Sequence, residues 1–348
     1  MTGTSPRPGT DLVGVLGTGT ALPGEPIGNE EIGERFGADP RWVERFIGTR
    51  TRHLGVDLAS GKVTHTLVDL ATEAAAAALD DAGMAPADVD VVVLATASPE
   101  HLMPASVNLV ADRLGIHQVP TFQLQSGCAG AMQALDVAHR AIGDANPVAL
   151  VVGADSCAKH LVLDHDFARL PASELVNYVI FGDGAGAALL GAGETSGALL
   201  GPVRNRFVGL GRDPGQVIRW FGAADRDSTD QPVDEDYKAI ESGVPGLAAD
   251  MVAELLAETG WPAATVTHLL PPQLGGRMTD LITAGLTERF GLTASAINCV
   301  ADTGNNGNAL PLLQLHRLVA DLGPGSRALG VAVESSKWIR TGFALESV

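Results

Sequence analysis

The chain has 348 residues, of which 45% are hydrophobic and 18% charged, so it is long and apolar enough to bury a sizeable globular core. Its 41 acidic residues outnumber 23 basic ones, and a net charge of −18 argues against nucleic acid or an anionic membrane surface as the main partner. Three cysteines without disulfide or metal-ligand spacing (Cys128, Cys157, Cys299), no signal segment and no apolar run of about 20 residues predict a cytoplasmic protein without a bound metal.

The first half of the chain alternates strands and helices. Strands are predicted over 11–21, 89–97, 121–124, 147–154 and, after a Gly-rich turn, within 180–191. Helices are predicted over 29–36, 40–46, 68–82, 104–114 and from the turn after 124 to 142. The segment 89–97, VDVVVLATA, is continuously apolar, which is typical of a strand buried on both faces in a layered α/β protein.

Cys128 stands in the stretch TFQLQSGCAGAMQALDVAHRAI, at an elbow between the strand 121–124 and the helix that follows. Free backbone N–H groups and the positive end of a helix dipole favour a thiolate there, which predicts a lowered pKa and a nucleophilic sulfur. Small neighbours on both sides leave the sulfur open to a bulky thioester. The alternative is a small hydrophobic residue in a tightly packed turn.

The second half repeats this order. The predicted elements are a helix at 247–258, a strand at 265–270, a helix at 278–290, a strand at 296–301, a helix at 309–320 and strands at 327–333 and 341–346. Asn305 takes the place in the second elbow that Cys128 takes in the first. We therefore expect two βαβαβαββ-like halves, 11–192 and 193–348, with each elbow aimed at a common centre. The polar segment 202–245 has no counterpart and is predicted to shape a pocket or a subunit contact.

Four motifs carry a resemblance to a known family. LVGVLGTGTALP, QSGCAGAMQAL, FGDGAGAALLG and TGNNGNALPL resemble, in order and spacing, the ketoacyl synthase III branch of the thiolase-fold condensing enzymes. The resemblance implies a five-layered αβαβα thiolase fold and a homodimer. It also implies coenzyme A or acyl-carrier-protein thioesters as substrates, with an acyl group held on the cysteine and no permanently bound cofactor.

The catalytic set of that family is a cysteine, a histidine and an asparagine. The resemblance assigns the first to Cys128 and the third to Asn305, but it places Pro272 where the histidine belongs. His268, four residues earlier in the same strand, is the candidate substitute; the alternative is a histidine satisfied within a packed strand.

The missing histidine affects the two half-reactions differently. Loading Cys128 needs only a thiolate and backbone donors, whereas decarboxylation loses one oxyanion donor, typically worth about 100- to 1000-fold in rate. We therefore predict an acyltransferase that passes the acyl group to an alcohol, amine or thiol in fatty-acid-like or natural-product biosynthesis. The alternatives are a decarboxylating synthase and a non-catalytic partner subunit.

Four residues are predicted to contact the thioester. By resemblance, Trp42 matches a tryptophan that stacks on the adenine of coenzyme A, and Lys159 replaces an arginine that contacts the same ring. Arg45 lies one position from another such arginine. Arg277 matches a basic position that the family uses toward carrier protein or phosphate. A phosphopantetheine thioester on a carrier protein is the alternative donor, and ordinary solvated surface is the alternative for these basic residues.

Overall fold

In the computed structural model, which describes residues 13–143, 147–164, 166–193, 197–219 and 233–348, ten strands form one mixed sheet. In sheet order these are β12 (Ser295–Ala296), β11 (His268–Leu270), β13 (Arg327–Glu334), β14 (Ile339–Ser347), β8 (Ala198–Phe207), β1 (Val13–Ala21), β7 (Gly184–Ala192), β6 (Val148–Asp155), β4 (Val91–Thr96) and β5 (Thr121–Gln125). Two small antiparallel pairs are β2 (Ile27–Gly28) with β3 (Thr51–Arg52), and β9 (Gln216–Ile218) with β10 (Val233–Glu235).

The strand order of the second half repeats that of the first. The sheet reads β5-β4-β6-β7-β1 from one edge and β12-β11-β13-β14-β8 from the other. In each half the first three strands pair in parallel and the rest pair antiparallel. The halves join where β1 and β8 pair antiparallel at Val13↔Leu200 and Gly14↔Leu199. The sequence predicts a duplicated order but misses β8, which takes the place of β1 in the second half. The prediction that 202–245 has no counterpart in the first half is therefore wrong for residues 202–207, because they belong to β8.

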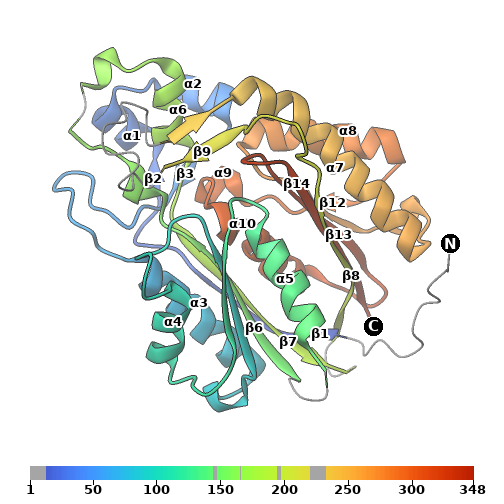
Figure 1. Cartoon of the computed structure of the whole chain (residues 1–348). Coiled ribbons are helices and arrows are strands. Elements are labelled where there is room, and N and C mark those ends of the chain that lie inside the picture. The colour runs from blue at the N-terminus through green and yellow to red at the C-terminus, as the bar shows by residue number, and fades with distance from the viewer. Residues whose placement is uncertain (1–12, 144–146, 165, 194–196, 220–232) are drawn as a thin grey trace.

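Helices cover both outer faces and fill the space between the two halves of the sheet (Figure 1). The outer helices are α3 (Leu67–Ala82) and α4 (Ser106–Leu114) on the first half, and α7 (Tyr237–Thr259) and α8 (Gly276–Phe290) on the second. The inner pair is α5 (Gly130–Ala141) and α10 (Leu310–Asp321), whose apolar faces share one core with strands of both halves. The arrangement is the predicted thiolase-like α/β fold.

Close helix packing explains two of the glycines in β1. A Cβ atom built on Gly17 would lie 2.5 Å from the carbonyl oxygen of Ala78, and one on Gly19 would lie 2.2 Å from that of Ala74. Both carbonyls belong to α3. The close approach of this helix therefore requires glycine at both positions of the GTGT segment in β1.

The remaining helices form a small cap beside the sheet. They are α1 (Asn29–Phe36), α2 (Pro40–Trp42), α6 (Ala172–Ile180) and, next to the second elbow, α9 (Val300–Thr303). Phe36, Phe167 and Tyr178 pack ring to ring in this cap, with centroid separations of 5.0 to 5.2 Å. None of the helices in the described part of the chain combines the length and apolarity needed to cross a membrane.

Several elements differ from the sequence-based expectation. The strand predicted over 296–301 ends at Ala296, because the Gln273 side chain accepts hydrogen bonds from the backbone N–H groups of Cys299 and Val300 and turns the chain into α9. Helix α7 begins ten residues before the predicted 247 and continues through Pro245. Helix α6 was not predicted. Within the predicted insertion 202–245, residues 220–232 lie outside the described part of the chain.

Candidate active site

Cys128 lies in the turn between β5 and α5, as the sequence predicts. The turn is closed by a 2.8 Å hydrogen bond from the N–H of Gly130 to the carbonyl of Gly127, and α5 begins at Gly130. A Cβ atom on Gly130 would lie 2.2 Å from the side-chain oxygen of Asn308 in the second elbow. The small residues around Cys128 therefore allow the two elbows to pack directly against each other.

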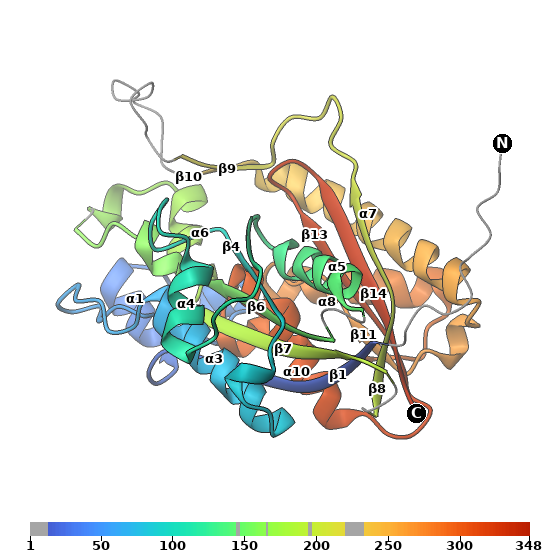
Figure 2. The same cartoon turned by 60° about the horizontal axis from the view of Figure 1, so that its bottom comes forward.

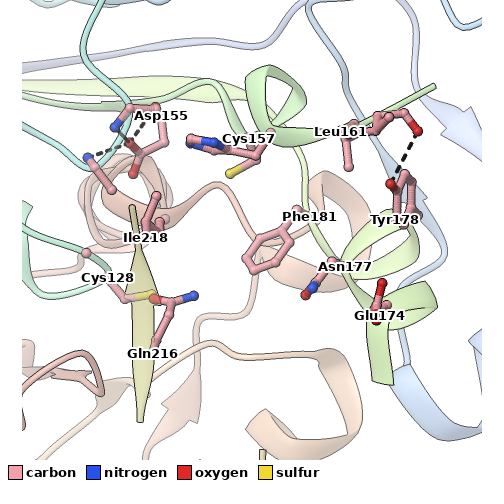
Figure 3. Close-up of a pocket in the computed structure, with 16 residues that line it drawn as sticks. Cys128, Asp155, Cys157, Leu161, Glu174, Asn177, Tyr178, Phe181, Gln216 and Ile218 are labelled. Carbon is pink, nitrogen blue, oxygen red and sulfur yellow. Dashed lines mark hydrogen bonds between the residues drawn. The ribbon is translucent and has the colours of Figure 1, made fainter. Parts of the chain in front are cut away.

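Cys128 lines two cavities, one on each side of the elbow. The larger, about 140 Å3, is walled by β9, by α6 and by the loop after β6. Figure 3 shows Gln216 and Ile218 beside Cys128, with Phe181 and Cys157 facing the same space. The smaller, about 20 Å3, lies toward residues 271–274 and α10. The half-buried thiol is therefore accessible from a cavity, which a nucleophile requires.

The electrostatics at Cys128 oppose the predicted thiolate. Burial raises the pKa of the Cys128 thiol well above its usual value, and the carboxyl groups of Glu334, Asp155 and Glu235 raise it further. The prediction that the helix dipole lowers this pKa is therefore wrong: desolvation and three acidic groups outweigh the few N–H groups at the start of α5. The resting residue is a thiol, so its acylation requires a nearby proton acceptor.

Asp155 connects the first half of the sheet to the second elbow. It is buried at the end of β6, and its Oδ1 accepts hydrogen bonds from the Thr96 hydroxyl and from the N–H and hydroxyl of Ser98. Its Oδ2 accepts two bonds of 2.8 Å from Asn308, one from the backbone N–H and one from the side chain. The same side chain donates to the carbonyl of Ser126, 2.8 Å away. Asn308 thus fixes the turn that holds Cys128.

Asn305, the predicted catalytic asparagine, is buried beside the smaller cavity. Its side-chain amide donates to the carbonyl of Leu274 at 3.1 Å and accepts from the N–H of Gly307 at 3.1 Å. Leu274 and Gly307 both line the smaller cavity with Cys128, although Asn305 itself is not among its lining residues. The second elbow therefore meets Cys128, but this asparagine already uses one of its two donor hydrogens inside the protein.

His268, the predicted substitute for the family histidine, is bonded away from Cys128. Its Nδ1 is 2.8 Å from the Thr267 hydroxyl and its Nε2 is 3.3 Å from a carboxylate oxygen of Asp321 at the end of α10. It lines neither cavity that contains Cys128. Pro272 lines the smaller of them. Both ring nitrogens of His268 therefore have partners within the packed strand and the neighbouring helix, which is the alternative that the sequence left open.

Two residues that the sequence analysis did not single out lie close to Cys128. His160 lines the larger cavity and is exposed to solvent. Glu334, the last residue of β13, is buried against the elbow and lies 3.4 Å from the N–H of Ala129. No local pattern in the sequence predicts the position of either side chain.

Two of the four predicted thioester contacts meet on the surface. Arg45 and Arg277 line one hollow of about 700 Å3, together with Arg50, whose guanidinium pairs with Asp302. Lys159 is engaged elsewhere: its ammonium group lies 3.0 Å from the carbonyl of Ser98 and 3.2 Å from the Glu100 carboxylate. Trp42 is partly buried against the apolar cap formed around α1 and α6, outside the lining of the hollow. The structure therefore brings the two arginines to one hollow and leaves Trp42 and Lys159 outside its lining.

Part of the predicted insertion closes the larger cavity. The ribbon of β9 and β10 lies beside α6 (Figure 2), and Gln216 and Ile218 of β9 line the cavity. Glu235 accepts hydrogen bonds from the side chains of Gln216 and Tyr237, and the Tyr237 hydroxyl lies 2.5 Å from Asn177 Oδ1 on α6. Gln216 and Ile218 thus form part of the cavity wall, and a polar network joins this ribbon to the cap.

Comparisons with known proteins agree on one family. Residues 122–204 match the family model for 3-oxoacyl-[acyl-carrier-protein] synthase III. A β-ketoacyl-[acyl-carrier-protein] synthase III from Rhizorhabdus wittichii is 31% identical over 300 residues, which cover 85% of this chain and 86% of that protein.

Two solved structures extend the similarity to the whole fold. The structure of AbyA1, a tetronic acid condensing enzyme, is 53% identical with a TM-score of 0.92 and matches 96% of this chain and all of that one. The 3-oxoacyl-(acyl carrier protein) synthase III of Pseudomonas aeruginosa PAO1 is 26% identical, with a TM-score of 0.81 over 97% of this chain and 98% of that one.

Proposed function

The chain belongs to the 3-oxoacyl-[acyl-carrier-protein] synthase III family of condensing enzymes, and on that premise we propose that Cys128 accepts an acyl group from an acyl-CoA or acyl-carrier-protein thioester and passes it to an acceptor without loss of carbon dioxide. The observation that carries the proposal is the position of the Cys128 thiol, at an elbow between two cavities. A group at that position can meet a thioester in the larger cavity.

A shortage of free hydrogen-bond donors supports transfer without decarboxylation. It concerns the residues of the second half of the chain that lie near Cys128. Decarboxylation creates an enolate oxygen that needs hydrogen-bond donors. Pro272 supplies none, the Gln273 amide donates to the carbonyl of Ile297, and Asn305 donates to the carbonyl of Leu274. Loss of one such donor costs about 100- to 1000-fold in rate, whereas acyl loading does not require an enolate.

The similarity to the tetronic acid condensing enzyme suggests the class of acceptor. A tetronic acid is a lactone that also contains a 1,3-dicarbonyl unit, so building one from thioesters requires a carbon–carbon and a carbon–oxygen bond. A methylene that already lies between two carbonyl groups supplies the carbon nucleophile without releasing carbon dioxide. We propose an acceptor of this kind, a carbon acid, in addition to the alcohol, amine or thiol expected from the sequence.

The donor is proposed to enter past the basic hollow. Arg45 and Arg277 offer two permanent positive charges in a chain with a net charge of −18, and such charges attract phosphate groups of coenzyme A or an acidic carrier protein. The predicted homodimer is part of the same proposal, and sedimentation analysis of the purified chain tests it: a monomer at micromolar concentration would contradict it.

Acylation of the protein tests the first half-reaction. The purified chain is incubated with a panel of acyl-CoA and acyl-carrier-protein donors, and intact mass is measured. Cys157→Ala is the matched control, because Cys157 lines the same cavity. We expect an acyl adduct on the wild type and on Cys157→Ala, and none on Cys128→Ala. No adduct on the wild type, or one that persists in Cys128→Ala, would overturn the proposal.

A decarboxylating synthase is the second candidate, because the curated relative at 31% identity is a β-ketoacyl-[acyl-carrier-protein] synthase III. Release of carbon dioxide from malonyl-CoA by the wild-type protein, at a rate matching its acyl transfer, would establish that alternative. A protein that forms no adduct with any donor would instead correspond to the predicted non-catalytic partner subunit.

A further inference from the structure

A third cavity adjoins the larger of the two cavities that Cys128 lines. It has a volume of about 160 Å3 and is bounded by Glu334 and Ser336 from the end of β13 and the turn after it. Ala97, Gly127, Gln216 and Ile218 line both cavities. The elbow and the β9 strand therefore stand between two spaces, each large enough for the reactive end of a small substrate.

Glu334 is the acidic side chain of this third cavity and lies against the elbow. Its side chain is buried, with Oε2 3.4 Å from the N–H of Ala129 and Oε1 3.1 Å from the N–H of Ser336. A Cβ atom built on Gly127 would lie 2.4 Å from Oε2. The carboxyl group thus touches the residues on both sides of Cys128.

The carboxyl group has no cationic partner within the described residues. Burying an acid without a counter-charge destabilises a fold, so a role in chemistry is a reason to retain it. Burial raises the pKa of Glu334, and nearby Asp155 raises it further. A carboxyl group with a raised pKa is better matched to proton transfer near neutral pH than an ordinary surface glutamate.

We propose that the cavity beside Glu334 holds the acceptor and that Glu334 is the general base of the second half-reaction. This inference rests on the proposed acyl transfer through Cys128. Gln125, Ser126 and Ser336 give the cavity polar side chains suited to an oxygen-bearing acceptor.

The step balances without any further reactant. Glu334 takes the proton from the attacking atom of the acceptor, and that atom forms a bond to the thioester carbonyl carbon on Cys128. The carbon–sulfur bond then breaks, and the departing thiolate of Cys128 takes the proton from the Glu334 carboxyl group. Both residues return to their starting states.

The discharge of preformed acyl-enzyme tests this role separately from loading. A donor that acylates Cys128 is removed by gel filtration, and loss of the adduct mass is followed from pH 5 to 9. One arm uses buffer alone, where water is the acceptor, and the other adds acetoacetyl-N-acetylcysteamine as a carbon acid. The variants are Glu334→Gln, Glu334→Asp and, as a charge control, Glu235→Gln on β10.

In the wild type we expect the discharge rate to rise with pH as Glu334 ionises, because only the carboxylate accepts a proton. Glu334→Gln should still load, lose that rise and discharge about 100-fold more slowly, a typical contribution of a general base. Glu334→Asp should recover part of the rate. Glu235→Gln removes a charge that also raises the pKa of Cys128 but should keep the pH-dependent rise.

Three outcomes would overturn the inference. One is discharge of Glu334→Gln at the wild-type rate in both arms. Another is a pH-dependent rise that survives in Glu334→Gln and disappears in His160→Gln, which would assign the base to the cavity histidine. The third is failure of the wild type to load at all, which would overturn the proposed function with it. Circular dichroism and thermal melting of each variant distinguish loss of a base from loss of the fold.

Discussion

Replacing Asn308 with alanine should destabilise the protein strongly, because this side chain connects three parts of the site. Its amide nitrogen lies 2.8 Å from Asp155 Oδ2 and 2.8 Å from the carbonyl oxygen of Ser126. A buried hydrogen bond to a charged group contributes about 1.5 to 3 kcal/mol and a neutral one about 1 kcal/mol. The substitution should therefore lower the free energy of unfolding by about 3 kcal/mol, a large part of the 5 to 15 kcal/mol that is typical of a domain.

Urea unfolding at fixed protein concentration measures this loss. The midpoint of Asn308→Ala should fall while the slope m stays unchanged, because the substitution alters a native contact and not the surface exposed on unfolding. Asn108→Ala is the matched control, since Asn108 is exposed and accepts one hydrogen bond from the Thr121 hydroxyl. The control should lose less than about 1 kcal/mol. A loss below about 1 kcal/mol for Asn308→Ala would refute the view that Asn308 holds the elbows together.

Three further predictions concern the chemistry. Because the negative charge of Glu334 raises the pKa of Cys128, Glu334→Gln should increase the thiolate fraction and speed alkylation by iodoacetamide at pH 8; an unchanged pH profile of alkylation would contradict this. Pro272→His should increase carbon dioxide release from malonyl-CoA, by about 100-fold if the imidazole reaches the enolate oxygen, and no increase would show that the missing donor is not limiting. Arg277→Ala should raise KM for the thioester donor more than it changes kcat, and the difference in KM between the variant and the wild type should shrink at high salt. Equal KM values for the two proteins at low salt would show that the basic hollow does not bind the donor.

The first of these predictions and the discharge experiment separate two effects of one residue. A purely electrostatic Glu334 would make its glutamine variant more reactive at every step, because the thiolate becomes more available. A general base would leave the same variant readily alkylated yet slow to discharge its acyl group. The two measurements together therefore tell whether Glu334 only raises the pKa of Cys128 or also accepts a proton during discharge of the acyl group.

The sequence by itself determined most of the order of the elements and the position of the elbow at Cys128. Apolar periodicity and small-residue turns are local signals, so the elbow at Cys128 and the repeated order of strands appear in the structure as predicted. Local signals also misled. The helix predicted from 247 begins at Tyr237, because a capped first turn and a buried apolar face accommodate Pro245 inside α7.

Only the tertiary structure decided which side chains surround the sulfur of Cys128. Those side chains set the pKa of its thiol. Glu334 is more than 200 residues from Cys128 in the chain, and no pattern along the sequence brings a carboxyl group to that elbow. Desolvation and the sum of several charges set a pKa, and both depend on how the two halves pack together. For the same reason His268, which lies in the right strand, ends up bonded to Asp321 instead of facing Cys128.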